Sequence, residues 1–102
     1  MEPHAITSLE ELVPVRFGIL APPEGAPLVP EEQIDLVLVP AVTFNEKGYR
    51  LGRGGGYYDR FLGRSGACSV GLGRERLIRE IPLEPHDMSV NCLVTEVCVR
   101  RF

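Results

Sequence analysis

The sequence predicts an α/β fold, a layered α/β/α arrangement with a largely parallel sheet. Three observations predict this class: apolar runs typical of buried strands, short amphipathic segments between them, and turn-forming residues at the boundaries. Strands that alternate with helices along a chain usually pair in parallel, with the helices packed on the sheet. With 102 residues, the chain has the length of one domain, so we expect residues 1–102 to form a single domain.

The first 30 residues are predicted to contain little regular structure. Residues 8–11 fit a capping box, which favours a short helix over residues 9–13 that Pro14 limits. Residues 15–20, VRFGIL, are typical of a short strand. Residues 21–30 contain four prolines, which cannot donate hydrogen bonds to a sheet, and are therefore predicted to form turns and loops.

The central segments predict one strand, one long loop and one helix. Residues 34–40, IDLVLVP, form a continuous apolar run, as expected for a strand buried on both faces. Residues 43–56 are predicted to be loop. Residues 43–46 also fit a capping box, but Gly48 follows and no periodic apolar run does, so we expect no helix there. Residues 57–64, YYDRFLGR, favour a short helix.

The C-terminal segments predict further alternation of strand and helix. Residues 67–73, ACSVGLG, are typical of a second buried strand, and residues 74–81 of a helix that ends before a proline. Residues 83–90 are predicted to be loop. Residues 91–102 are rich in β-branched side chains and predict one strand, or two strands with a kink near Glu96.

Composition argues against several classes of protein. The net charge is −3, from 11 basic and 14 acidic residues, whereas a nucleic-acid-binding protein usually carries a basic surplus. No apolar run approaches the roughly 20 residues that a membrane span needs, and the first residues lack the pattern of a secretory signal. We expect a cytoplasmic protein without nucleic-acid or membrane partners, whose Cys68, Cys92 and Cys98 are reduced core residues.

A run of glycine and arginine, RLGRGGGYYDRFL at residues 50–62, calls for a chemical explanation. The start of a helix offers unpaired N–H groups, and arginine makes paired hydrogen bonds to phosphate oxygens. Gly52 and Gly54 fit the dinucleotide pattern G-x-G-x-x-G, but Tyr57 occupies its last position, and the chain contains no Gly-Lys-Ser/Thr. The spacing alone therefore leaves two interpretations open, a phosphate-binding loop or a tight structural loop with solvated arginines.

Residues 35–62, DLVLVPAVTFNEKGYRLGRGGGYYDRFL, closely resemble the signature of the 5-formyltetrahydrofolate cyclo-ligase family, also called 5,10-methenyltetrahydrofolate synthetases. Residues 81–96, IPLEPHDMSVNCLVTE, resemble a second segment of that family, in the expected order. The resemblance runs from about Phe17 to Glu96. It implies that the chain corresponds to the C-terminal part of a larger family fold.

The resemblance implies an ATP- and Mg²⁺-dependent enzyme. Such an enzyme converts 5-formyltetrahydrofolate to 5,10-methenyltetrahydrofolate and releases ADP and phosphate. In the family the formyl oxygen attacks the γ-phosphate of ATP, the neighbouring folate nitrogen closes the ring, and phosphate leaves. Phosphoryl transfer depends on positioning and on neutralising the charge of the phosphate oxygens, which a loop with glycine N–H groups and arginine can provide.

The resemblance also implies roles for individual residues. ATP would contact Arg50, Leu51, Gly52, Arg53, Gly54, Gly55, Gly56, Tyr57 and Tyr58. The folate substrate would border Arg53, Gly54, Gly55, Gly56 and Tyr57, and Arg53 would be the catalytic residue. Asp59 and Asp87 would hold Mg²⁺, which prefers oxygen ligands and often uses one or two carboxylates. Without the resemblance, Asp59 is an ordinary acid of a first helical turn, and His86 a solvent-facing loop residue.

The sequence departs from the family pattern in several places. Family members carry a substantial N-terminal half before the segment that corresponds to Phe17, so we expect a partner that supplies this half or a homo-oligomer. An exposed apolar face or sheet edge would promote self-association. Local departures are Ala21 in place of a common Glu, Arg76 in place of Gln, and Asn91 in place of Asp.

Two other functions stay open at this point. The first is a non-catalytic nucleotide-binding module or regulatory paralogue that retains the glycine loop without the folate half-site. The second is an RNA- or protein-interaction domain that uses the arginines, which the net charge of −3 disfavours.

Overall fold

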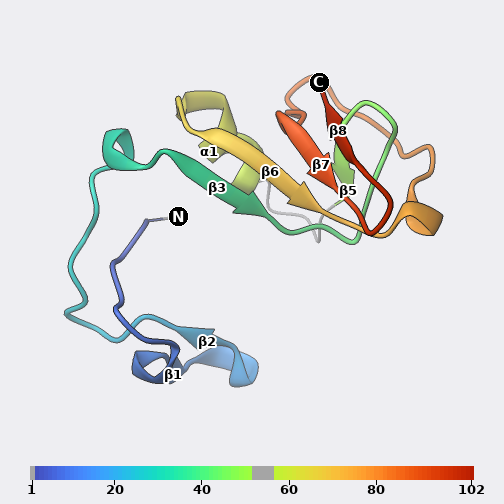
Figure 1. Cartoon of the computed structure of the whole chain (residues 1–102). Coiled ribbons are helices and arrows are strands. Elements are labelled where there is room, and N and C mark those ends of the chain that lie inside the picture. The colour runs from blue at the N-terminus through green and yellow to red at the C-terminus, as the bar shows by residue number, and fades with distance from the viewer. Residues whose placement is uncertain (1, 52–56) are drawn as a thin grey trace. The chain divides into compact units, whose positions relative to one another are not determined.

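A computed structural model of the chain describes residues 2–51 and 57–102, except for the side chain of Tyr57 (Figure 1). The contacts within the chain define two compact units, Met1–Ile34 and Asp35–Phe102. The expectation that residues 1–102 form a single domain stays a prediction.

The first unit contains a small antiparallel hairpin and single turns of 3-10 helix. Its elements are η1 (Leu9–Glu11), β1 (Val13–Pro14), η2 (Arg16–Gly18), β2 (Leu20–Ala21) and η3 (Glu31–Gln33). The prediction of a strand over residues 15–20 is wrong, because the chain reverses within it. Phe17 and Gly18 both have positive φ, 61° and 72°, which is incompatible with an extended strand.

The capping box at Ser8 is confirmed, although the helix it begins is shorter than predicted. The Ser8 hydroxyl accepts a hydrogen bond from the N–H of Glu10, and the Glu11 carboxylate accepts one from the N–H of Ser8 at 3.0 Å. The N–H of Thr7 also donates to Glu11, and these backbone bonds lower the pKa of the Glu11 carboxyl. The helical turn ends at Glu11 because the chain enters the hairpin at Val13.

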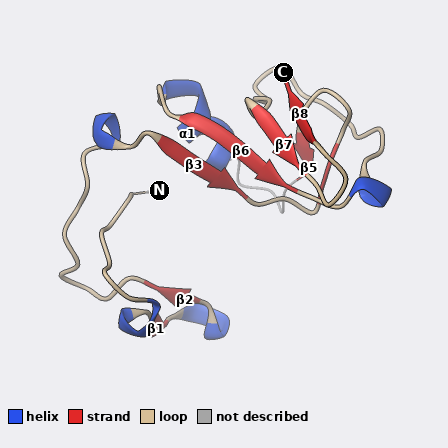
Figure 2. Ribbon diagram, in the orientation of Figure 1, coloured by secondary structure: helices blue, strands red, loops and turns tan. Residues whose placement is uncertain are grey.

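The second unit is built on a four-stranded sheet in the order β3-β6-β7-β8 (Figure 2). Its strands are β3 (Leu36–Val39), β6 (Cys68–Leu72), β7 (Cys92–Val94) and β8 (Val99–Arg101). β3, β6 and β7 pair in parallel, and β8 pairs with β7 antiparallel. The predicted α/β class and largely parallel sheet are therefore confirmed. Residues 91–102 form two strands, the second of the two arrangements predicted, with a turn closed by the Thr95 N–H and the Cys98 carbonyl.

The predicted helix at residues 57–64 is confirmed as α1 (Tyr57–Arg64), which lies in the connection from β3 to β6. The helix predicted over residues 74–81 is wrong: only one 3-10 turn forms, η4 (Glu75–Leu77). The segment instead bonds to β4, since the Arg79 N–H donates to the Phe44 carbonyl and the Thr43 hydroxyl donates to the Leu77 carbonyl. Within the parts of the chain that the structure describes, no helix is long and apolar enough to span a membrane.

Residues 43–51 form a second hairpin where the sequence predicted only a loop. β4 (Thr43–Phe44) pairs antiparallel with β5 (Arg50–Leu51). The side-chain oxygen of Asn45 accepts hydrogen bonds from the N–H groups of Lys47 at 2.9 Å and Tyr49 at 3.0 Å, and so closes the turn. The absence of a helix after residues 43–46 agrees with the prediction.

One face of the four-stranded sheet carries the core. Its buried apolar side chains are Val39, Phe44, Phe61, Leu62, Val90 and Leu93. The Phe44 ring packs directly on Gly71 in the central strand β6, and it leaves no room there for a side chain. Val39, Gly71 and Leu93 share this face by strand register.

The opposite face of the sheet is exposed, which corrects two expectations. Leu36 and Leu38 of β3 are 54% and 58% exposed, so the apolar run of residues 34–40 is buried on one face only. The cysteines are free thiols, but Cys68 and Cys98 are exposed and Cys92 is half-buried, so none belongs to the core. The exposure of Leu36, Leu38 and Cys68 has one cause, since the only described α-helix, α1, lies in a crossover on the core side.

Substituting alanine for Gly71 is expected to destabilise the protein, whereas the same change at Gly63 is not. A Cβ at Gly71 would lie 2.6 Å from the buried Phe44 ring, and such overpacking costs about 1–3 kcal/mol. A Cβ at Gly63 in α1 meets nothing within 4 Å, and alanine there stabilises the helix by about 0.5 kcal/mol. Urea unfolding of both variants tests this. Equal midpoints for the two variants would contradict the packing of Phe44 on Gly71.

Candidate functional site

Asp59 and Asp87, which the resemblance implied as metal ligands, lie close together. Asp59 is in the first turn of α1, and Asp87 is in the loop that leads to β7. The exposed His86 joins them, and one ligand atom from each of the three residues lies within 4.8 Å of the others. The structure thus brings together two acids that are far apart in the sequence.

Backbone hydrogen bonds fix the position of both carboxylates. Asp59 Oδ1 accepts from the Met88 N–H at 3.2 Å, which ties the loop to α1. Asp87 Oδ2 accepts from the Glu84 N–H at 2.8 Å, and the Asp87 N–H donates to the Glu84 carbonyl. His86 Nε2 lies 3.7 Å from Asp87 Oδ1. One loop therefore carries Asp87 and is bound to the helix that carries Asp59.

The donor atoms of this cluster suit a hard divalent cation. Mg²⁺ is usually held by one or two carboxylates and completed by phosphate oxygens and water. Asp59 and Asp87 supply the two carboxylates, and both are only half-buried, which leaves their site open to a ligand from solvent. The residues present therefore fit a magnesium ion.

The predicted ATP- and folate-binding residues lie mostly outside the described part of the chain. These are Gly52, Arg53, Gly54, Gly55 and Gly56, together with the side chain of Tyr57. Their predicted contacts, including the catalytic role of Arg53, stay predictions. The described residues on either side form β5, which ends at Leu51, and α1, which begins at Tyr57.

Arg50 connects the segments on both sides of the glycine run. Its guanidinium lies 5.0 Å from the centre of the Tyr58 ring in α1, and it donates a hydrogen bond to the Pro40 carbonyl at 3.2 Å. A cation above an aromatic ring is attracted by the negative electrostatic potential of the ring face. Arg50, at the start of β5, thus contacts the residue after β3 and the first turn of α1, in addition to the role in ATP binding that the resemblance implies.

A polar network at the ends of β6 and β7 was not predicted from the sequence. The Thr95 hydroxyl donates to Glu75 Oε2 at 2.6 Å, and Arg100 forms an ion pair with Glu75 Oε1. The Glu75 N–H donates to Glu96 Oε1 at 2.9 Å. The partners of Glu75 are 20, 21 and 25 residues away in the chain, so no local spacing marks them.

This network lowers the pKa of two carboxyl groups. The Thr95 hydroxyl, followed by Arg100, lowers the pKa of Glu75 below its usual value of about 4.5. The Glu75 N–H lowers the pKa of Glu96. A carboxyl whose pKa is lower in the folded state stabilises the fold above its unfolded pKa, and this contribution is lost as the pH falls through the folded pKa.

The Glu75→Gln variant is therefore expected to lose less thermal stability on acidification than the unmodified chain. The two proteins should differ in melting temperature as the pH falls below about 4.5. There the Glu75 carboxylate of the unmodified chain takes up a proton and loses its ion pair with Arg100. Melting temperatures measured from pH 7 to pH 3 test this. Glu80→Gln, at an exposed glutamate outside the network, is the control, and its melting temperature should fall with pH as that of the unmodified chain does. An equal fall in the melting temperature of Glu75→Gln would contradict the role of the network.

The residues that depart from the family pattern lie outside the acid cluster. Asn91, in place of Asp, accepts hydrogen bonds at Oδ1 from the Ser69 N–H at 2.7 Å and from the Ser69 hydroxyl at 3.1 Å. Ser69 is buried, so Asn91 satisfies polar groups at the base of β6. Arg76 lies exposed in η4, and Ala21 lies in β2 of the first unit.

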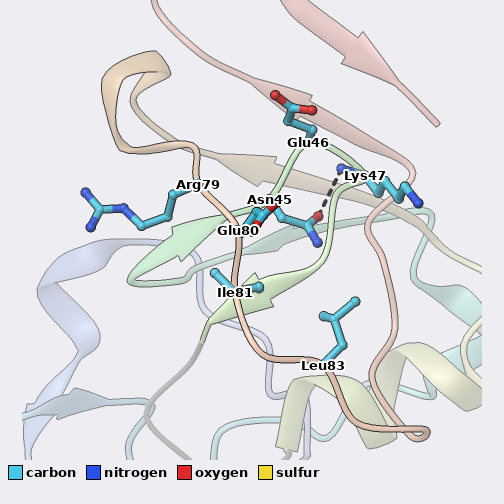
Figure 3. Close-up of a pocket in the computed structure, with 7 residues that line it drawn as sticks. All are labelled: Asn45, Glu46, Lys47, Arg79, Glu80, Ile81 and Leu83. Atoms are coloured by element: carbon cyan, nitrogen blue, oxygen red, sulfur yellow. Dashed lines mark hydrogen bonds between the residues drawn. The ribbon is translucent and has the colours of Figure 1, made fainter.

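A separate cavity of about 360 Å³ lies between the β4–β5 turn and residues 79–83 (Figure 3). Its lining residues are Asn45, Glu46, Lys47, Arg79, Glu80, Ile81 and Leu83. The side chains of Glu46, Lys47 and Arg79 point in different directions (Figure 3). Because these charges do not converge, the cavity offers no defined site for a charged ligand.

Comparison with known proteins shows which family the chain resembles. The sequence profile described as the 5-formyltetrahydrofolate cyclo-ligase family matches residues 1–96. The 5-formyltetrahydrofolate cyclo-ligase of Mycolicibacterium smegmatis is 41% identical over 90 residues, which cover 82% of this chain and 45% of that protein. The enzyme of the same name from Mus musculus is 35% identical over 111 residues, which cover 94% of this chain and 54% of that protein.

Solved structures agree with this assignment. The NMR structure of the 5,10-methenyltetrahydrofolate synthetase from Aquifex aeolicus matches with a TM-score of 0.81 at 39% identity, over 98% of this chain and 52% of that one. The synthetase from Mycoplasma pneumoniae matches with a TM-score of 0.63 at 30% identity, over 74% of this chain and 46% of that one. The chain spans about half the length of the curated relatives it matches. Since the profile covers nearly all of its residues, the chain belongs to the 5-formyltetrahydrofolate cyclo-ligase family.

Proposed function

We propose that the chain provides the nucleotide- and metal-binding half of an ATP- and Mg²⁺-dependent 5-formyltetrahydrofolate cyclo-ligase. One observation supports this most directly: Asp59 and Asp87, selected by the resemblance as metal ligands, have ligand atoms within 4.8 Å of each other. Asp59 lies in the first turn of α1, which follows residues 52–56 in the chain, and Asp87 lies beside it in the loop before β7. We likewise propose a cytoplasmic location and no nucleic-acid or membrane partner.

In this proposal, residues 50–58 bind ATP and Arg53 stabilises the transferred phosphate. The formyl oxygen of 5-formyltetrahydrofolate attacks the γ-phosphorus, and the bond to ADP breaks. The neighbouring folate nitrogen then attacks the formyl carbon, the carbon–oxygen bond breaks, and phosphate leaves with the 5,10-methenyl product formed. The ion held by Asp59 and Asp87 would neutralise phosphate charge, which is the main requirement of phosphoryl transfer.

The complete reaction is proposed to need a partner, because the chain spans only 45% of the Mycolicibacterium smegmatis relative. That partner is a polypeptide with the remaining part of the family sequence, or a second copy of this chain. The same observation favours one other function. Without the remaining part, the chain would be a nucleotide-binding module that binds ATP and does not bind 5-formyltetrahydrofolate.

A turnover assay and a binding assay separate these functions. The chain is incubated with 5-formyltetrahydrofolate, Mg²⁺ and ATP, and the absorbance of the methenyl product is followed, with Asp59→Asn as the inactive control. Product that the variant does not form supports the ligase. No product, with ATP binding retained and no folate binding by fluorescence titration, supports the module. Absence of Mg²⁺-dependent ATP binding in a folded sample contradicts both.

A further inference from the structure

His86 is the third member of the cluster that contains Asp59 and Asp87, and the proposed function gives it no role. One ligand atom from each of the three residues lies within 4.8 Å of the others. The His86 side chain is 61% exposed, so water alone could satisfy both of its ring nitrogens. Both nitrogens nevertheless lie beside carboxylates, Nδ1 beside Glu84 and Nε2 beside Asp87. This placement calls for a chemical explanation.

The distance between His86 and Asp87 suits two ligands of one ion. His86 Nε2 lies 3.7 Å from Asp87 Oδ1, which is longer than a direct hydrogen bond. Two atoms that each lie about 2.1 Å from one ion are about 3–4.2 Å apart, depending on whether they take neighbouring or opposite positions. Asp87 Oδ2 accepts a hydrogen bond from the Glu84 N–H, so Oδ1 is the oxygen that is left for an ion. The two groups are therefore spaced for an ion between them.

The Glu84 carboxylate lies at the other nitrogen of the imidazole ring. Glu84 Oε2 is 3.5 Å from His86 Nδ1. A histidine that binds a metal through one nitrogen usually donates the N–H of the other to a carboxylate, which fixes the tautomer and the orientation of the ring. Here Nδ1 would carry that N–H, and the lone pair of Nε2 would face Asp87. Glu84, His86 and Asp87 therefore follow the order of a carboxylate–histidine–metal arrangement.

A tight turn over residues 84–87 presents these groups together. The Asp87 N–H donates to the Glu84 carbonyl at 3.0 Å, and Pro85 occupies the second position of the turn, where its fixed φ favours this conformation. The next N–H, that of Met88, donates to Asp59 Oδ1 at 3.2 Å. The turn that carries Glu84, His86 and Asp87 is thus attached to the helix that carries Asp59.

We propose that His86 is a third protein ligand of the ion that Asp59 and Asp87 hold, with Glu84 as its positioning residue. Mg²⁺ prefers oxygen ligands, whereas imidazole nitrogen suits divalent transition metals. The site therefore binds a transition metal ion such as Co²⁺ more tightly than Mg²⁺. The inference rests on the proposed function, because it takes Asp59 and Asp87 as ligands, and it adds a third ligand and the class of metal.

Calorimetric titrations with Co²⁺ alone and with Mg²⁺ alone test this without ATP, folate or turnover. The unmodified chain should bind Co²⁺ about tenfold more tightly than Mg²⁺, or better. His86→Ala should weaken Co²⁺ binding about tenfold or more and change Mg²⁺ binding by less than about twofold. His4→Ala is the matched control, because His4 is the only other histidine and donates to the Ala26 carbonyl in the first unit. Both affinities should stay unchanged in that variant.

The two histidines also allow a direct measurement of coordination by proton NMR. Because Co²⁺ is paramagnetic, it moves the ring signals of a coordinated imidazole far outside their usual range. Co²⁺ should shift the signals of His86 in this way and leave those of His4 in place.

A variant of Glu84 tests its positioning role separately. Glu84→Ala retains the backbone N–H that Asp87 Oδ2 accepts, so the carboxylate of Asp87 stays in place. The variant should weaken Co²⁺ binding more than Mg²⁺ binding, since only Co²⁺ depends on the orientation of the imidazole. An equal loss for the two metals would show that Glu84 acts through its charge alone and would overturn its positioning role.

Three results would overturn the role of His86. Co²⁺ binding that Asp59→Asn abolishes but His86→Ala leaves unchanged would mean that the two carboxylates hold the ion without the histidine. Co²⁺ binding that shifts no His86 signal would lead to the same conclusion. In both cases the proposed function would stand. Absence of Co²⁺ binding to a folded sample would also overturn the inference, and the proposed function would then be decided by Mg²⁺-dependent ATP binding, which is a separate measurement.

Discussion

Replacing Asp59 with asparagine is expected to weaken Mg²⁺-dependent ATP binding at least tenfold, or about 1.4 kcal/mol. The substitution removes one of the two negative charges that would hold the ion, and a neutral amide is a weaker ligand for a hard cation. The asparagine oxygen can still accept the hydrogen bond that the Met88 N–H donates to Asp59 Oδ1. The change therefore removes charge while retaining the contact between α1 and the loop.

Calorimetric titration of the chain with ATP, with and without Mg²⁺, measures this effect. Asp35→Asn is the matched control, because Asp35 is an exposed acid of the same unit outside the cluster. Asp87→Asn should behave like Asp59→Asn, and the double variant should add little once the ion is lost. If Asp59→Asn binds ATP as Asp35→Asn does, the proposed metal site is wrong.

Replacing Phe44 with alanine is expected to destabilise the protein by about 3–5 kcal/mol, the usual cost of deleting a buried aromatic ring. Phe44 is 2% exposed. Its ring packs on Gly71 of the central strand β6 and on Gly73, which follows that strand. Neither glycine has a side chain that could fill the space left by the ring. The loss is a large share of the stability of a domain of this size.

Urea unfolding, followed by circular dichroism, measures the loss. Phe17→Ala is the control, because Phe17 is 91% exposed and surface substitutions usually change stability by less than about 0.5 kcal/mol. Both variants delete the same atoms, so a difference between them reports burial. Similar midpoints for the two variants would mean that the Phe44 ring does not form the core of the sheet.

The sequence predicted those elements whose own residues determine them. The runs at β3 and β6 are long and apolar enough to predict strands, and α1 follows from its helical residues. The segment at residues 74–81 has a helical pattern too, but hydrogen bonds from Arg79 and to Leu77 attach it to β4. Such bonds between distant segments override local preference and leave no trace in the spacing of side chains.

The same distinction applies to the candidate site. The pairing of Asp59 with Asp87 came from the resemblance, since nothing in their spacing indicates that a helix and a distant loop meet. The Glu75 network was missed for that reason. The two-residue strands β4 and β5 were missed because they are too short to show a periodic pattern. The apolar run at β3 predicted burial on both faces, but only the face that carries Val39 is buried, because the spacing of side chains does not show which faces of a sheet other segments cover.

The hydrogen bond from Met88 to Asp59 has a consequence for how an ion would bind. It holds the loop carrying Asp87 against the helix carrying Asp59, so the two acids are neighbours before any cation arrives. Their mutual repulsion opposes this arrangement, and a divalent ion would relieve it. Binding of the ion would then cost little free energy for ordering its ligands, because they are already in place. Departure of the ion would leave two like charges that the Met88–Asp59 hydrogen bond keeps close together, so the stability of the loop before β7 would depend on occupancy.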